Sequence, residues 1–515
     1  MQETKQAANR VAKNTGILYV QMGLTIFLSL YATRLILAAL GAEDFGIFNV
    51  VGGAIAMLTF LNTAMSAASQ RFMSFAQGEG NFNKQKQIFN ISLILHFFIA
   101  ITIVILLEIM GYFLFDGILK ISPDRLNVAT MIYQFLIIST FFTIISVPYD
   151  AIINSHENML LVAILRIVEI TLKLGIAIFI TYTSFDKLYV FGLLMASLTV
   201  FLLIIRQIYC HKKYKEVTIN FKSYYDKALF KEMTSFAGWS FLGSAASMIT
   251  MQGMTVLINS FFGVIVNAAQ GIALQITGQI MAFSNTMLKA LNPLIVKSEG
   301  EDNRDRMLKA SITGNKISFF LLAFFAIPLI IEMPYVLDLW LKDVPKYAVI
   351  FCQLNIFRSM VSQLTITFPT AIGATGNIKK SQLVESIIWI LLLPISYIMF
   401  KSGTAPETIY INLIFMVIGF SISRIYFTHR ICGLSIKKYF EDVLLRALIV
   451  ALVTAAFAIS PILLMSEGFA RLIIVCLVSS IVFLILILTV GLNISEKTLI
   501  INMGKTVFTK KIKRS

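Results

Sequence analysis

The segment ARLIIVCLVSSIVFLILILTVGL occupies residues 470–492 and contains one charged side chain, Arg471. A helix needs about 20 apolar residues to cross the hydrocarbon core of a bilayer. The rest of the chain has the same character, because 57% of its 515 residues are hydrophobic and 14% are charged. A soluble protein contains about 25% charged residues. The sequence therefore predicts a protein whose solvent is lipid.

Fourteen segments of this kind follow one another along the chain. Only closed helices or barrels satisfy the backbone in lipid, and these segments are too long for barrel strands. The predicted fold class is an all-α membrane protein. The predicted spans are 15–39, 46–69, 88–115, 127–152, 159–182, 188–209, 236–261, 264–288, 311–333, 347–373, 381–400, 407–427, 443–465 and 470–492.

The basic residues predict the orientation of these spans. About 32 of the 43 Lys and Arg residues fall on the side that carries both termini, and about seven fall on the other side. The positive-inside rule therefore predicts that both termini are cytoplasmic, in a bacterial inner membrane. It also accounts for the net charge of +16 without a nucleic-acid partner, since the charge is spread over short loops. The basic N-terminus has no cleavage motif, so the first span is expected to be retained.

Three sequence similarities at a common spacing indicate an internal duplication. GEGNFNKQKQIFNIS at 78–92 resembles SEGEDNRDRMLKASIT at 298–313, and SVPYDAIINSHEN resembles TFPTAIGATGN, which aligns Pro148 with Pro369. LGAEDFG has a weaker counterpart in FFGVIVN. Six spans per repeat give both halves the same orientation, with a substrate site between them. The two prolines are candidate hinges, because proline interrupts the helical hydrogen bonds.

The duplication predicts the domain organisation. A first six-helix bundle covers 1–210, a basic cytoplasmic linker covers 211–235, and a second six-helix bundle covers 236–430. The last two spans and a basic tail, 431–515, have no counterpart in the first half and are expected to form an appendage.

Three motifs carry a resemblance to a known family: LGAEDFGIFNVV, SQRFMSFAQGEGN and VPYDAIINSHENML. Together with the fourteen spans, they resemble the polysaccharide-transport branch of the multidrug/oligosaccharidyl-lipid/polysaccharide (MOP) exporter superfamily. The resemblance covers the first twelve spans. It implies alternating access and a flippase for undecaprenyl-diphosphate-linked oligosaccharide, of the O-antigen or capsule type. Membrane lipids, a polysaccharide polymerase and chain-length machinery are the further partners that it implies. Drug exporters share this fold, so the fold alone does not select the cargo.

Charged residues inside the spans are the best candidates for a binding site, because each costs about 2.5–3.5 kcal/mol to insert. Arg358 lies about 16 Å into its span, close to the midplane. Its guanidinium offers paired donors suited to a diphosphate. Arg166, Glu169 and Lys173 share one helix face at i, i+3 and i+7. They predict either a cationic cavity wall tuned by Glu169 or a salt-bridge ladder that neutralises itself.

The remaining candidates have simpler alternative roles. Arg34 could place its charge at the membrane interface, and Lys289 could be a positive-inside anchor. The amides of Asn267 and Gln270 could bind sugar hydroxyls or hold helices together. Asp150, beside Pro148, is a candidate coupling site. Glu108, Glu332 and Glu385 are further acids for which a structural role is favoured.

Several functional classes lack their usual signals in this sequence. The histidines and cysteines form no metal-spaced cluster, so no metal or other cofactor is expected. No P-loop motif is present, so transport would be coupled to the membrane potential, an ion gradient or consumption of the product. A cation-coupled exporter of drugs or small solutes is the first alternative. A membrane-embedded polysaccharide polymerase or ligase is the second, although the short outer loops disfavour an enzyme.

Overall fold

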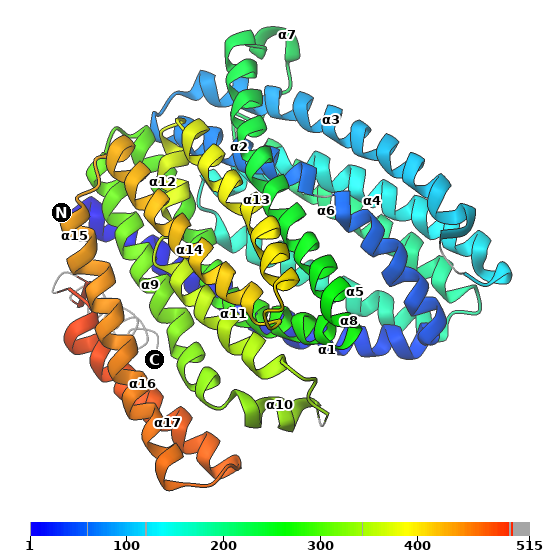
Figure 1. Ribbon diagram of the computed structural model, residues 1–515. Helices are drawn as coiled ribbons and strands as arrows, with labels where there is room; N and C mark the ends of the chain where they lie inside the picture. Colours follow the sequence, from blue (N-terminus) through cyan, green and yellow to red (C-terminus); the bar gives the residue numbers. More distant parts are fainter. Residues whose placement is uncertain (1, 59, 119–120, 342, 494–495, 498–515) are drawn as a thin grey trace, which may run out of the picture. The chain divides into compact units, whose positions relative to one another are not determined.

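The computed structural model describes residues 2–58, 60–118, 121–341, 343–493 and 496–497 (Figure 1). Every regular element within these ranges is helical. Eleven of the helices are long and apolar enough to cross a membrane. The fold class predicted from the sequence is therefore confirmed.

The first half of the chain forms long helices joined by short turns, with one π-helical turn after α3. The elements are α1 (Gln2–Leu58), α2 (Phe60–Gly78), α3 (Phe82–Phe113) with a π-helical turn (Leu114–Ile118), α4 (Pro123–Ser155), α5 (Met159–Tyr182), α6 (Lys187–Lys213) and the short α7 (Phe221–Tyr224).

The second half begins with the longest helix and ends with a helical pair. The elements are α8 (Lys227–Gly300), α9 (Arg304–Ile331), α10 (Met333–Leu341), α11 (Ala348–Gln363), α12 (Phe368–Ala374), α13 (Lys379–Lys401), α14 (Thr408–Phe427), α15 (Ile436–Tyr439), α16 (Arg446–Leu464) and α17 (Phe469–Leu486), with π-helical turns at Thr428–Cys432, Phe440–Leu445 and Ile487–Gly491.

The chain divides into two compact units. The N-terminal unit contains Asn14–Ser244 and Val296–Asp302, and the C-terminal unit contains the residues up to Lys13, Ala245–Ile295 and the described residues from Asn303 onward. Each unit has its own apolar core. Ile132 and Leu107 are fully buried in the first core, and Leu322 and Phe351 are fully buried in the second.

Two glycines mark the duplication in the backbone itself. Gly41 bends α1 with φ 79° and ψ 172°, and Gly263 bends α8 with φ 80° and ψ −176°. This region of φ/ψ space is almost restricted to glycine. The two glycines lie 222 residues apart, and each separates two predicted spans. The same local conformation in both repeats confirms the pseudo-symmetric architecture.

The turns after α2 and α8 repeat the same spacing. Gly80 and Asp302 both adopt positive φ, at 66° and 56°. The next residues, Asn81 and Asn303, cap α3 and α9, and each side chain accepts a hydrogen bond from the backbone N–H three residues later. An asparagine N-cap satisfies one of the free N–H groups at a helix start. The capping chemistry therefore explains why these two stretches look alike in sequence.

Three of the predicted spans are not among the eleven helices that are long and apolar enough to cross a membrane, and the reasons differ. The central part of α5 contains Arg166, Glu169 and Lys173, so the middle of this helix is more highly charged than that of the eleven. The second part of α8 is rich in side-chain amides, and the span at 46–69 includes residue 59, which lies outside the described residues. Apart from the turn at 364–367 and a few end residues, all fourteen spans nevertheless lie on helical segments where the structure describes them.

The predicted span 347–373 is confirmed, but its helix divides into α11 and α12. Proline disfavours helical geometry in the preceding residue and has no N–H to donate. Pro369 accordingly lies in the first turn of α12. At the break, Asn315 Oδ1 on α9 accepts from the Thr367 N–H at 2.8 Å, and Tyr439 Oη donates to the Leu364 carbonyl at 2.9 Å.

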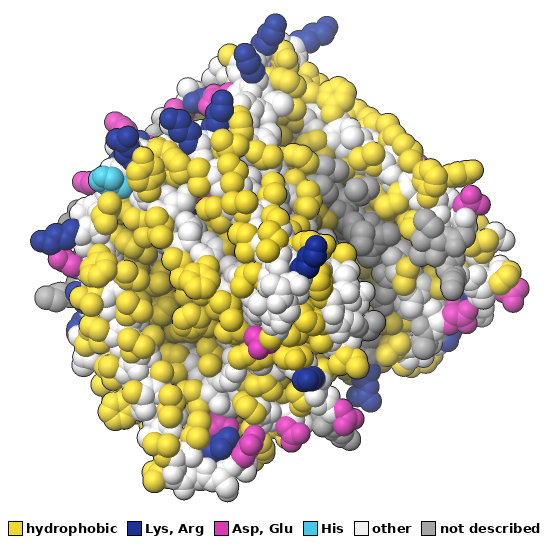
Figure 2. Space-filling model, in the orientation of Figure 1, with side chains coloured by type: hydrophobic (Ala, Val, Ile, Leu, Met, Phe, Trp, Pro, Cys, Tyr) yellow, Lys and Arg dark blue, Asp and Glu magenta, His cyan; other side chains and the backbone are white. Residues whose placement is uncertain are grey.

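The last two spans pack against α9 as part of the C-terminal unit (Figure 1). At one end of α9, Glu332 forms a bidentate salt bridge with Arg471 at 2.9 Å. Near the middle of α9, the fully buried Lys316 Nζ donates to Glu496 Oε2 at 2.6 Å. The outer flanks of α16 and α17 are apolar, as expected of lipid-facing helices, with Leu463 81% exposed (Figure 2).

Two ion-pair clusters fix the loops of the N-terminal unit. At the predicted outer side, Arg125 bridges Asp44, which lies in α1 just after the Gly41 bend, and Asp186, which caps α6. At the predicted inner side, His156 pairs with Glu216 at 2.5 Å and so fastens the linker after α6 to the turn after α4. Burial raises the pKa of Glu216, but hydrogen bonds from His156 and the backbone outweigh it and leave this pKa below its ordinary value.

Candidate substrate site

Arg358 lies in the middle of α11 and has a defined orientation. Its Nε donates to Asn355 Oδ1 at 2.9 Å, and its Nη2 donates to Ser359 Oγ at 3.0 Å. No carboxylate of the described residues forms a salt bridge with it. Burying a positive charge without a counter-charge is costly unless another group compensates it. Arg358 is therefore a cation held in place by neutral side chains, with its Nη1 group left to donate elsewhere.

A polar seam joins α11 to the second part of α8. Asn355 Nδ2 donates to Thr277 Oγ1 at 2.9 Å, and Ser284 Oγ donates to Gln363 Oε1 at 2.7 Å. Thr277 and Ser284 are seven residues apart, so they share one helix face. Asn355, which orients Arg358, is thus itself held in place by α8.

Two further polar groups in the C-terminal unit are buried without a hydrogen-bond partner among the described residues. Gln270 is 1% exposed, and neither its amide nitrogen nor its amide oxygen is bonded. Tyr410 on α14 packs on Phe351 with ring centroids 4.8 Å apart, and its hydroxyl is also unbonded. Such groups normally find partners in protein or water, so they are available to a polar ligand.

We expect Asn355→Leu to reduce transport about tenfold more than Gln363→Leu. Asn355→Leu removes the hydrogen bonds of Asn355 to Thr277 and Ala273, and Gln363→Leu removes the one from Ser284. Each substitution should cost about 1–3 kcal/mol of stability. Asn355 also accepts a hydrogen bond from Arg358, whereas the hydrogen bond of Gln363 is to Ser284. Transport assays and thermal unfolding of both purified variants would test this difference. Equal transport losses at equal stability would show that Asn355 has no positioning role.

The charged stripe of α5 is partly neutralised. Arg166 Nη1 donates to both carboxylate oxygens of Glu169 at 2.8 Å, and both side chains are substantially exposed. Lys173 is half-buried and has no salt bridge among the described residues. Arg166 and Glu169 therefore form the predicted local pair, and Lys173 is left as a cation.

Asp150, the candidate coupling residue, pairs with a residue that the sequence reasoning missed. Arg206 Nε on α6 lies 2.9 Å from Asp150 Oδ1. Ser146 Oγ donates to the other carboxylate oxygen at 3.4 Å. Pro148 is buried within α4, between these two residues. Opposite charges repeated along both α4 and α6 would have indicated this pairing in the sequence. A single arginine near the end of α6 does not indicate it.

The other predicted site residues form no hydrogen bond or ion pair through their side chains within the part of the chain that the structure describes. Arg34 on α1 and Lys289 on α8 are exposed, and Asn267 is half-buried. The structure does not bring all candidates into one unit. Arg358, Gln270, Asn267, Lys289 and Pro369 belong to the C-terminal unit, and Arg166, Glu169, Lys173, Arg34, Asp150 and Pro148 belong to the N-terminal unit.

Acids within the spans are mostly paired. Besides the pair of Glu332 with Arg471, Glu385 accepts from Arg424 Nε and Nη2 at 3.0 and 3.1 Å. Glu108 accepts from Gln134 at 3.2 Å. Among the described residues, no group of three or more His, Cys, Asp or Glu side chains could hold a metal ion.

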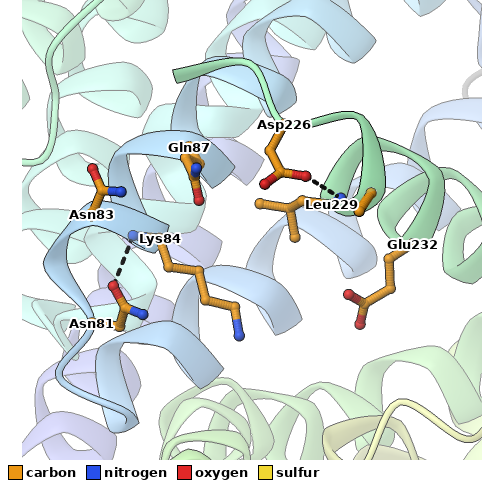
Figure 3. Close-up of a pocket in the computed structure, with 8 residues that line it drawn as sticks. Asn81, Asn83, Lys84, Gln87, Asp226, Leu229 and Glu232 are labelled. Carbon is orange, nitrogen blue, oxygen red and sulfur yellow. Dashed lines mark hydrogen bonds between the residues drawn. The ribbon is translucent and has the colours of Figure 1, made fainter. Parts of the chain in front are cut away.

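A polar pocket of about 310 Å³ lies between the start of α3 and the start of α8 (Figure 3). It is at the predicted cytoplasmic side, away from the spans. Asp226 caps α8 there by accepting from the Leu229 N–H, and Lys84 pairs with Glu79. The lining residues are Asn81, Asn83, Lys84, Gln87, Asp226, Ala228, Leu229 and Glu232.

Comparison with known proteins gives a family and a fold. The model of the family described as "Polysaccharide biosynthesis protein" matches residues 11–299. No curated protein is significantly similar in sequence. A multidrug resistance MATE family transporter of the MOP superfamily, solved in an outward-facing conformation, is 15% identical with a TM-score of 0.70, and the match covers 84% of this chain and 96% of that one.

Two other solved structures extend this likeness. A MATE structure in the bent conformation is 13% identical with a TM-score of 0.71, covering 84% of this chain and 99% of that chain. A MOP superfamily transporter from Pyrococcus furiosus is 14% identical with a TM-score of 0.67, covering 84% and 97%. Its structure is described as having a binding pocket of reverse polarity that suggests a different function. At these identities the likeness shows the fold alone.

Proposed function

Because the chain belongs to the polysaccharide biosynthesis protein family and has the fold of the MOP superfamily transporters, we propose that it is a lipid-linked oligosaccharide flippase. The cargo is an undecaprenyl-diphosphate-linked repeat unit, which crosses from the inner to the outer leaflet of a bacterial inner membrane by alternating access.

The balance of charge inside the spans carries this proposal. Asp150, Glu169, Glu332 and Glu385 each pair with an arginine, so their negative charge is compensated within the protein. Arg358 and Lys173, in contrast, have no salt bridge among the described residues. Glu108, bonded to the amide of Gln134, and Glu407, at the first residue of its span, are the acids without a salt bridge among the described residues. Arg34, Lys173 and Arg358 outnumber them, so the net uncompensated charge on the spans is positive. This favours an anionic cargo over the cationic drugs that an acidic pocket would select.

The chemistry of a diphosphate fits these residues. A phosphate group loses strong hydration when it enters a membrane protein, and charge-assisted hydrogen bonds from a guanidinium replace part of it. Arg358 keeps Nη1 available for this bond while Asn355 and Ser359 hold the rest of the group in place. Unpaired amide and hydroxyl groups, such as those of Gln270 and Tyr410, suit sugar hydroxyls. The polyprenyl chain can stay in lipid throughout.

Deletion of the gene tests the proposed cargo. We expect lipid-linked repeat units to accumulate on the inner leaflet and the surface polymer to be lost, because the polymerase acts on the outer side. Extraction of polyprenyl-linked glycans and surface staining would measure both, with the intact gene supplied on a plasmid as the control. An unchanged surface polymer with altered drug tolerance would instead identify a cation-coupled exporter of the same fold.

A further inference from the structure

A mostly apolar groove of about 430 Å³ lies along α6, near the end of this helix that is predicted to be cytoplasmic. The residues that line the groove are Ile205, Ile208, Tyr209, Lys212 and Lys213. Their spacing of three and four residues places them on one face of the helix. The groove, called here the α6 groove, is therefore apolar at one end and positively charged at the other. This arrangement suits an amphipathic ligand that carries a negative charge.

The apolar part of this helix face continues beyond the groove into the span. Phe201 lies seven residues before Ile208, so it is on the same face, and the two side chains are 47% and 52% exposed. From Phe201 to Lys212 the helix rises about 16 Å. Half of a hydrocarbon core about 30 Å thick has nearly the same depth. The face therefore offers an apolar surface as deep as one leaflet, with lysines where the head groups lie.

The positive charge at the end of the α6 groove is not neutralised by the protein. Both lysines are exposed, and neither forms a salt bridge with another described residue. None of the described lining residues is acidic. Two acids of adjoining segments are already paired, Glu216 with His156 and Asp150 with Arg206. The two ammonium groups are therefore available to an anion from outside the protein.

Tyr209 adds a hydrogen-bond donor with a fixed position between the apolar and the charged parts of the groove. Asn158 Nδ2 donates to the Tyr209 hydroxyl at 2.9 Å and to the Tyr214 hydroxyl at 3.0 Å. Asn158 is itself held as the cap of α5, where its Oδ1 accepts from the Leu161 N–H at 3.2 Å. Because Asn158 is the donor, the Tyr209 hydroxyl keeps its own proton for another acceptor. Tyrosine is also common at the depth of the head groups.

We propose that the α6 groove is a binding site for one anionic phospholipid of the leaflet on the predicted cytoplasmic side. The lipid phosphate lies against Lys212, Lys213 and the Tyr209 hydroxyl, and an acyl chain lies along Ile208 and Ile205. Basic pockets at this side of a membrane protein bind anionic head groups by charge complementarity. A soluble anion would gain nothing from the apolar part of the groove. A lysine that served only as a topological anchor would need neither the groove nor the oriented hydroxyl.

Lipid binding to the purified full-length protein tests this site. Native mass spectrometry would follow titration with dioleoyl phosphatidylglycerol, and dioleoyl phosphatidylcholine would serve as the zwitterionic comparison. We expect the wild type to bind phosphatidylglycerol selectively, and Lys212→Gln combined with Lys213→Gln to weaken this binding roughly tenfold. The matched control is Lys227→Gln combined with Lys231→Gln, which removes the same charge from exposed residues of the same unit outside the groove. The control pair should bind phosphatidylglycerol as the wild type does.

The Ile208→Trp variant separates a lipid from a soluble anion. Ile208 is half exposed, so tryptophan there leaves the core unchanged but fills the groove, and phosphatidylglycerol binding should weaken a few-fold with both lysines intact. Millimolar inorganic phosphate should not displace the lipid. Unchanged binding in the groove lysine pair or in Ile208→Trp, an equal loss in the control pair, or displacement by phosphate would each overturn the proposal. The experiment uses no transport cargo, so failure of the proposed function would leave its result unaltered.

Discussion

Replacing Arg358 with glutamine should reduce transport of the lipid-linked cargo by about a hundredfold and abolish complementation of a deletion strain. A hydrogen bond to a charged group contributes about 1.5–3 kcal/mol, and a guanidinium can supply two of them to a diphosphate. Glutamine keeps a polar side chain that can bond to Ser359, so loss of the charge dominates the effect. Surface polymer and purified flipping activity, both normalised to protein in the membrane, would measure it.

The Arg358→Lys variant separates charge from geometry. It keeps the positive charge but not the planar set of donors, so transport should fall to an intermediate level. Arg430→Gln serves as the control, because this exposed arginine lies outside the α8–α11 seam. Near-normal transport in Arg358→Gln would remove this residue from the binding site, even though its orientation in the fold is well defined.

Lys316→Met should destabilise the protein by about 3–5 kcal/mol, the typical cost of removing one partner of a buried ion pair. Lys316 is fully buried. Without it, Glu496 would keep its charge, and its hydrogen-bond partners among the described residues would be the Asn493 N–H at 2.8 Å and the Thr313 hydroxyl at 3.4 Å. A fall in the thermal unfolding midpoint of the purified protein would measure the effect.

The double variant Lys316→Met with Glu496→Leu should regain most of the lost stability, because it leaves no isolated charge. Lys309→Met, at a residue of α9 near its start, is a suitable control for the loss of positive charge. If the single and double variants unfolded at the same temperature as the wild type, the ion pair would contribute nothing to the attachment of the last two spans.

The sequence predicted those parts of the fold that depend on local pattern. Apolar length located all fourteen spans on helical segments, and repeated turn chemistry around Gly78 and Gly300 revealed the duplication. The division between α11 and α12 was not predicted, because Asn315, which accepts from the Thr367 N–H, lies 52 residues away. A hydrogen bond across that separation leaves no periodic trace in a single sequence.

In the candidate site, too, contacts between residues far apart in the sequence could not be predicted. The unusual placement of Arg358 in an apolar segment could be recognised from the sequence alone. Its support by Asn355 and Thr277 could not, since these two side chains are 78 residues apart and come from different helices. Likewise, Asp150 is a suspicious acid in the sequence, whereas its partner Arg206 is visible only when α4 and α6 are packed together.

The ion pairs on α9 have a consequence for biosynthesis. Lys316 and Glu332 take their counter-charges from Glu496 and Arg471, which the ribosome reaches more than a hundred residues later. A nascent chain that has inserted α9 therefore carries two unneutralised buried charges until its final segment has been translated. Assembly of this half of the protein is consequently completed after synthesis of the last helix, and chains that stop early would be substrates for membrane proteases.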